Sequence, residues 1–150
     1  MKISTEGLQL IKQQEGFRNR TYLDVAGFPT IGYGHRLIHP GSFPDGVTED
    51  EAAGILASDV RDAEQAVGRL VKVPLTQGQF DALVDFCFNL GSGRLASSTL
   101  LKVLNVGRYA DAADQLLRWD QAGGQECPAL KARRNAELAL WNQACKSAAA

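Results

Sequence analysis

Two carboxylic acids stand nine positions apart near the start of the chain, Glu15 and Asp24. Glu15 follows Leu8 and Ile11 by seven and four positions, spacings that place it on the apolar stripe of a predicted helix. A carboxyl group that loses hydration keeps its proton to higher pH, as a general acid requires. Asp24 stands beside residues 25–27, Val-Ala-Gly, a segment suited to a β-turn, where a carboxylate is better hydrated. The two environments predict one acid and one base.

A hydroxyl and an imidazole follow the two carboxyl groups. Thr30 and His35 lie in the run PTIGYGH, residues 29–35, whose alternation predicts a strand. A hydroxyl six positions after Asp24 can hold a water molecule for that carboxylate. His35 is a candidate general base, but no serine or cysteine in a nucleophile motif stands near it. We therefore prefer a structural role for His35.

The elements that must position these residues are a helix and a small sheet. Ser4 or Thr5 can cap a helix that runs to Glu15, where Gly16 provides a left-handed stop. Residues 17–47 are rich in Gly, Pro, Thr, Tyr and Phe in short alternating runs, which is typical of two or three strands. Such a sheet has little core of its own, so it needs neighbouring helices for stability.

The rest of the chain is patterned for helices. Thr48 and Glu51 form a capping box that opens a helix of about twenty residues, ending by Pro74. Further helices are predicted to begin near Thr76, Ser97 or Ser98, Tyr109 and Pro128. The predicted fold class is α+β, with an N-terminal helix, a small antiparallel β lobe, a long connecting helix and a C-terminal helical lobe. We expect one domain over residues 1–150, with the β lobe at about 16–47 and the helical lobe at about 48–145 plus the N-terminal helix.

Composition and charge exclude several classes of partner. The chain has 16 basic and 17 acidic residues, so nothing favours bulk attraction to nucleic acid or to an anionic membrane. No apolar run approaches the roughly 20 residues that span a bilayer, and the first residues do not form a signal peptide. A cytoplasmic start is therefore expected. The three cysteines, Cys87, Cys127 and Cys145, lack metal-site spacing, so free thiols are predicted, with Cys87 in the core.

The segment QEGFRNRTYLDVAGFPTIGYGH, residues 14–35, resembles the catalytic segment of the phage-type lysozymes, a family of glycoside hydrolases. The spacing of its Glu, Asp and Thr is specific, whereas the GxGH motif alone is a weak signal. Four later segments resemble the helical half of the same family, so the resemblance covers nearly the whole chain. They are ALVDFCFNLG (82–91), TLLKVLN (99–105), WDQAGG (119–124) and LKARRNAE (130–137).

The resemblance implies a lysozyme-like fold and an endolysin that hydrolyses the β-1,4 bond between N-acetylmuramic acid and N-acetylglucosamine in peptidoglycan. Glu15 is then the acid, and Asp24 and Thr30 hold the attacking water in an inverting reaction. For that geometry the carboxyl groups are expected about 6.5–9.5 Å apart. No metal and no organic cofactor are implied. A holin is implied for release to the cell wall, not as a binding partner, and a monomer is expected.

The resemblance also implies roles outside the catalytic segment. It places Phe88, Arg36 and Gln115 against the saccharide, although Phe88 also fits plain core packing. It pairs His35 with Asp59 on the long helix as a structural ion pair that clamps sheet to helix.

Paired arginines in the last helix have two interpretations. Arg133 and Arg134 can form a solvated helix face, or one of them can reach Glu15 or a substrate group. We favour the second interpretation for one of the two.

Two other functions compete with hydrolysis. A lytic transglycosylase uses one carboxylate and leaves a 1,6-anhydro sugar, whereas a catalytically silent module binds peptidoglycan without turnover. The presence of Asp24 and Thr30 beside Glu15 argues against both.

Overall fold

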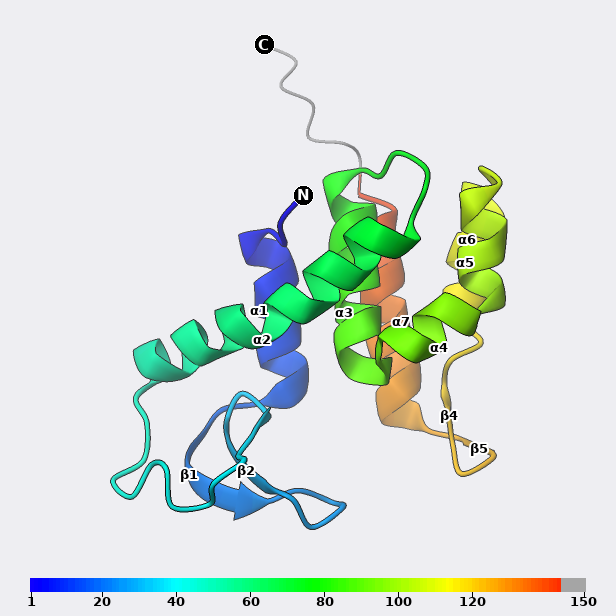
Figure 1. Cartoon of the computed structure of the whole chain (residues 1–150). Helices are drawn as coiled ribbons and strands as arrows, with labels where there is room; N and C mark the ends of the chain where they lie inside the picture. Colours follow the sequence, from blue (N-terminus) through cyan, green and yellow to red (C-terminus); the bar gives the residue numbers. More distant parts are fainter. Residues whose placement is uncertain (144–150) are drawn as a thin grey trace. The chain divides into compact units, whose positions relative to one another are not determined.

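The computed structural model describes residues 1–143, so the predicted free thiol of Cys145 lies outside the described residues. Figure 1 shows the course of the chain. Within the described residues, seven helices and five short strands form a mixed α+β fold, as predicted. The helices are α1 (Thr5–Glu15), α2 (Glu49–Leu70), α3 (Gln77–Leu90), α4 (Ser92–Ser97), α5 (Thr99–Asn105), α6 (Tyr109–Leu116) and α7 (Pro128–Trp141). The strands are β1 (Arg18–Leu23), β2 (Pro29–Gly32), β3 (His35–Arg36), β4 (Gln121–Ala122) and β5 (Gln125–Glu126).

The chain divides into two compact units, one of which is Ile11–Asp62. This unit holds a three-stranded antiparallel sheet in the order β1-β2-β3, which follows α1 along the chain in Figure 1. Thr30 of β2 pairs with Tyr22 on one side and Arg36 on the other. The small core beneath the sheet consists of buried apolar residues from the strands, the following loop and α2. They are Ile31, Leu37, Val47 and Ala52, with Phe17, Tyr33, Phe43 and Ile55 packed against them.

The other unit combines residues 1–10 with 63–143 and contains the helical core. Residues 80–87 of α3 are all buried, and α3 packs lengthwise against α7 while α5 packs against α6 (Figure 1). Local sequence signals explain where several helices begin. Thr76 and Gln79 form a complete capping box, Ser98 caps α5 and Pro128 opens α7.

The secondary structure differs from the predictions in three places. The long helix α2 ends at Leu70, four residues before Pro74. Residues 92–97 form the separate short helix α4, which was not predicted. The paired glycines 123 and 124 form the turn of a β-hairpin that was not predicted either, and both have positive φ angles, of 59° and 80°.

Candidate active site

Glu15 is the last residue of α1, as the sequence predicted. Ser4 caps the start of this helix through a hydrogen bond from Gly7 N–H, and Gly16 ends it with a φ of 71°. The Glu15 side chain is half-buried and lies against Gly34, where an added β-carbon would stand 2.7 Å from its Oε2 atom. Gly34 also has a φ of +72°, a conformation that favours glycine. The weak GxGH motif thus contains a glycine required by the carboxylate of Glu15.

Asp24 shapes the turn between β1 and β2. Its Oδ1 accepts hydrogen bonds from the backbone N–H groups of Ala26 and Phe28, both at 2.9 Å. Its own N–H donates to the carbonyl of Phe28 at 2.9 Å, and its carbonyl accepts from Gly27 N–H at 2.9 Å. Such a side chain to backbone turn is typical of aspartate. One carboxylate oxygen is therefore held by the backbone, whereas the contact found for Oδ2 among the described residues is with Arg36, at 3.8 Å.

Thr30 lies in the middle of β2 and is only 3% exposed. Its hydroxyl donates a hydrogen bond of 2.8 Å to the carbonyl of Phe28, the residue that also binds Oδ1 of Asp24. Because the hydroxyl proton is committed, the remaining interaction open to Oγ1 is acceptance of a hydrogen bond. Phe28 therefore links Asp24 and Thr30 through its backbone.

The structure also brings His35 and Asp59 together. Nδ1 of His35, in β3, lies 2.8 Å from Oδ2 of Asp59, in α2, and both side chains are half-buried. The contact joins the sheet to α2 within the same unit. It becomes an ion pair when the imidazole is protonated.

Arg36 follows His35 and lies over the ring of Phe28, with 3.9 Å between its guanidinium carbon and the ring centroid. Phe28 is 44% exposed and the Arg36 side chain 62% exposed. The other two predicted substrate-binding residues, Phe88 on α3 and Gln115 on α6, belong to the helical unit, and both are half-buried.

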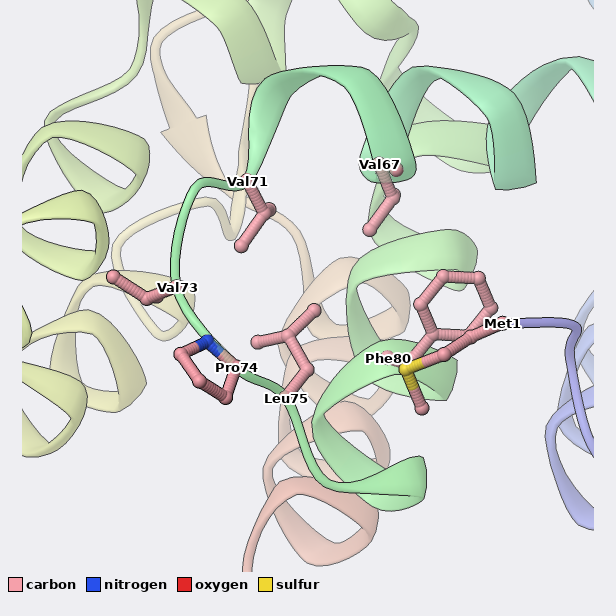
Figure 2. Close-up of a pocket in the computed structure, with 8 residues that line it drawn as sticks. Met1, Val67, Val71, Val73, Pro74, Leu75 and Phe80 are labelled. Atoms are coloured by element: carbon pink, nitrogen blue, oxygen red, sulfur yellow. The ribbon is translucent and has the colours of Figure 1, made fainter.

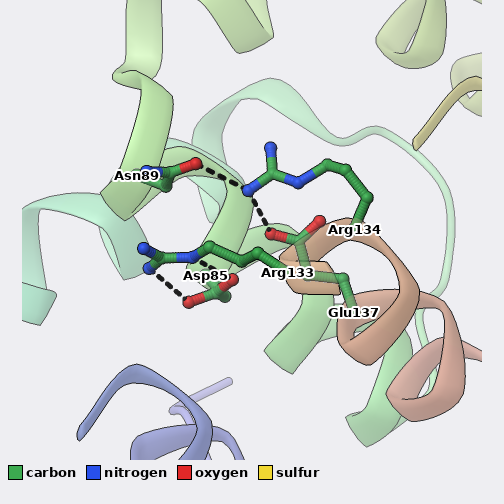
Figure 3. Close-up of polar contacts among 5 residues, drawn as sticks. All are labelled: Asp85, Asn89, Arg133, Arg134 and Glu137. Carbon is green, nitrogen blue, oxygen red and sulfur yellow. Dashed lines mark hydrogen bonds and ion pairs between the residues drawn. The ribbon is translucent and has the colours of Figure 1, made fainter. Parts of the chain in front are cut away.

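Arg133 and Arg134 are buried, at 6% and 0% exposure, so the interpretation of a solvated helix face is wrong. Arg133 binds both oxygens of Asp85, at 3.0 and 2.7 Å, as Figure 3 shows. Arg134 donates to Asn89 at 2.6 Å and lies 3.0 Å from Oε1 of Glu137 (Figure 3). That one arginine approaches Glu15 or a substrate group stays a prediction.

The partners of these arginines were not predicted from the sequence. Asp81, Asp85 and Asn89 recur at intervals of four along the otherwise apolar helix α3, a polar stripe that predicts buried partners. Glu137 stands three residues after Arg134 on α7, the spacing of a helical ion pair. These signals were present in the sequence.

Glu137 is fully buried. Burial is the largest cause that raises its pKa well above the usual value of 4.5, and the neighbouring Asp85 carboxylate adds to the rise. Within the described residues neither of its oxygens has a well-aligned hydrogen bond, so loss of hydration is the main cause. Burial likewise lowers the pKa of Arg134, and the carboxylates of Glu137 and Asp85 oppose that change. Burial therefore disfavours the charged form of Glu137.

A separate pocket of about 210 Å³ opens in the helical unit, as Figure 2 shows. No ionisable side chain lines it, and it holds none of the predicted catalytic residues. Its lining consists of Met1, Val67, Gly68, Val71, Val73, Pro74, Leu75 and Phe80.

Several classes of site find no support within residues 1–143. His, Cys, Asp and Glu side chains of this part nowhere gather in groups of three or more that could hold a metal ion. None of its helices is both long and apolar enough to cross a bilayer. Cys87 and Cys127 are free thiols, and Cys87 is buried, as predicted.

Residues 12–137 match the family model of phage lysozyme. The endolysin of Bacillus phage B103 is 42% identical over 145 residues, which make up 94% of this chain and 54% of that protein. The endolysin of Salmonella phage P22 is 40% identical over 144 residues, or 94% of this chain and 98% of that protein. This chain thus spans about half of the first relative and nearly all of the second.

Among solved structures, the muramidase domain of SpmX from Asticaccaulis excentricus is similar to this chain, with a TM-score of 0.86 and 38% identity. The match covers 95% of this chain and 99% of that domain. The fold is therefore lysozyme-like, and the protein is of the glycoside hydrolase class, as predicted from the sequence. The chain belongs to the phage lysozyme family.

Proposed function

We propose that this protein is an endolysin that hydrolyses the β-1,4 bond between N-acetylmuramic acid and N-acetylglucosamine in bacterial peptidoglycan. The observation that carries the proposal is the different surroundings of the two oxygens of the Asp24 carboxylate. Oδ1 accepts hydrogen bonds from two backbone N–H groups, whereas Oδ2 is the oxygen proposed to accept a proton. A carboxylate oriented in this way is suited to act as a general base.

The water nucleophile is proposed to lie between Asp24 and Thr30. A water that donates one hydrogen to Oδ2 of Asp24 and the other to Oγ1 of Thr30 has a lone pair left for attack. The existing hydrogen bond from Thr30 to the Phe28 carbonyl supports this arrangement, because it turns the hydroxyl into an acceptor. Asp24 takes the proton of the water as the new bond to the sugar carbon forms.

Glu15 is proposed as the general acid that protonates the leaving glycosidic oxygen. Its half-buried position at the end of α1 supports this role, since the helix fixes its backbone and Gly34 leaves room for its carboxylate. Attack from the face opposite Glu15 inverts the anomeric configuration. An inverting reaction requires about 6.5–9.5 Å between the two carboxyl groups, which leaves space for the water.

Other residues are proposed to serve binding and stability. Phe88, Arg36 and Gln115 bind the saccharide or its substituents, in keeping with the mixture of aromatic and polar groups that sugar sites use. The contact between His35 and Asp59 supports a structural clamp between β3 and α2.

We further propose that the protein stays in the host cytoplasm until a holin opens the inner membrane, and then acts on peptidoglycan as a monomer. The relatives named as phage endolysins support this part of the proposal.

The test compares wild type with Glu15→Gln and Asp24→Asn on permeabilised Gram-negative cells, with folding checked by circular dichroism. Wild type should clear the suspension and release products that carry one added water, and both variants should not. Asp114→Asn is the matched control, because it removes an exposed carboxylate on α6. Products with 1,6-anhydro ends would instead establish a transglycosylase, and binding to the wall without any release of sugar would establish a silent binding module.

A further inference from the structure

Arg36 carries a positive charge that has no part in the proposed acid and base steps. Its guanidinium lies 3.8 Å from Oδ2 of Asp24, which is too long for a hydrogen bond. An ion pair this exposed contributes little to stability. Within residues 1–143 no hydrogen bond of the Arg36 guanidinium to another residue is found, so its donors remain available.

The guanidinium is nonetheless held in place. It lies 3.9 Å from the ring centroid of Phe28, a geometry in which the plane of charge and the aromatic face attract each other. Phe28 itself is anchored by its backbone, through hydrogen bonds with Asp24 and Thr30. Arg36 is anchored too, since its backbone pairs with Thr30 across β2 and β3. Its charge is therefore fixed beside the proposed nucleophilic water.

A fixed cation at this place does not suit the reacting sugar ring. The transition state of glycoside hydrolysis develops positive charge on the ring, which a neighbouring guanidinium repels. The charge of Arg36 must therefore be directed to another part of the substrate. The glycan of peptidoglycan is uncharged, whereas its peptide stems carry free carboxylates, for which arginine is the preferred partner.

We propose that Arg36, braced by Phe28, forms an anion-binding arm that recognises a carboxylate of the peptide stem next to the bond being cleaved. Arg36 touches the substrate, whereas Phe28 is a positioning residue that acts through Arg36. This inference rests on the proposed hydrolysis of peptidoglycan. It adds which feature of the substrate the unit Ile11–Asp62 recognises.

The experiment uses soluble glycan strands with peptide stems in two forms, one with free stem carboxylates and one with these carboxylates converted to amides. For wild type, KM should be several-fold lower on the free acid form, with similar kcat on both. Arg36→Met should raise KM on the free acid form by roughly 3- to 10-fold, as expected for one charge-assisted contact, and bring the ratio of the two KM values near one.

Phe28 is tested by two substitutions that differ in the ring. Phe28→Leu keeps apolar bulk but removes the aromatic face, so it should shift the KM ratio in the same direction as Arg36→Met. Phe28→Tyr retains the face and should restore most of the wild-type ratio. In the Arg36→Met background, Phe28→Leu should have no further effect on the ratio, because the two residues act as a unit.

Arg18→Met provides the matched control, because this substitution also removes one positive charge. Arg18 also stacks on an aromatic ring, that of Tyr22 at 4.7 Å. Arg18→Met should keep the wild-type KM ratio. Equal KM values of wild type on both substrates, or a loss confined to kcat in Arg36→Met, would overturn the inference while leaving the hydrolase intact. Failure of wild type to cleave either form would overturn the proposed hydrolysis, and this inference with it.

Discussion

Gly34 lies so close to Glu15 that a β-carbon at residue 34 would stand 2.7 Å from the Oε2 atom of the carboxylate. Both residues belong to the same compact unit, at the end of α1 and just before β3. The space in which the proposed acid works is therefore set by the absence of a side chain at residue 34.

Replacing Gly34 by alanine should disable the enzyme beyond its effect on folding. The backbone conformation at φ +72° costs a non-glycine residue about 1–2 kcal/mol, and the methyl group displaces the Glu15 carboxylate. Gly107→Ala is the control, because Gly107 has a φ of +84° and nothing within 4 Å of an added β-carbon. Both variants should lose similar stability in urea unfolding, but only Gly34→Ala should lose activity, by about tenfold or more. Equal activity of the two would contradict the role assigned to this contact.

Removing the hydroxyl of Thr30 should lower kcat. Thr30→Val keeps the shape of the side chain but removes one of the two donors to the Phe28 carbonyl and one of the two acceptors of the proposed water. We expect a fall of about 10²-fold, in the usual range for loss of support to a general base, whereas Thr30→Ser should keep most activity.

The anomeric form of the first product, followed by NMR, should be inverted in wild type. A product of retained configuration would rule out the water-based mechanism.

Asp85 should be among the costliest carboxylates to remove. Asp85→Ala deprives the buried guanidinium of Arg133 of two hydrogen bonds, at 3.0 and 2.7 Å. Breaking a buried pair typically costs about 3–5 kcal/mol, since the remaining charge keeps its loss of hydration. Thermal unfolding measures this loss directly. Asp114→Ala, which changes an exposed residue of α6, should alter stability by less than about 0.5 kcal/mol.

Glu137 should make the protein less stable as pH rises. Its pKa is raised in the folded state, so above the usual 4.5 the folded protein binds more protons than the unfolded chain. The stabilisation is therefore fully present below the unfolded pKa and is lost as pH rises toward the folded value. Glu137→Gln removes this titration, so its free energy of unfolding should depend less on pH between 4.5 and 8 than that of wild type. Urea unfolding across this range measures the slope, and parallel curves would show that the pKa of Glu137 is not raised in the folded state.

His35 and Asp59 should be energetically coupled. A half-exposed pair with 2.8 Å between its polar atoms is expected to contribute about 0.5–1 kcal/mol. The variants His35→Asn, Asp59→Asn and the double variant form a cycle whose coupling energy isolates the pair. A coupling energy of zero would remove the proposed clamp.

The sequence by itself determined the features that depend on neighbours along the chain. The helix that ends at Glu15, the turn around Asp24 and the capping box at Thr76 all follow from hydrogen bonds between residues a few positions apart. Periodicity likewise predicted that Cys87 of α3 lies in the core. These features are local, so residue type and spacing are sufficient to specify them.

Only the tertiary structure decided the contacts between distant residues. Arg133 meets Asp85 across 48 positions, and this contact makes an arginine whose role the sequence left open part of a buried network. Gly34 meets Glu15 because β3 returns toward the end of α1, and Arg36 meets Phe28 because neighbouring strands pair in one register. Such contacts depend on how side chains pack after the chain has closed its loops, and a linear pattern does not specify which of several polar residues will meet.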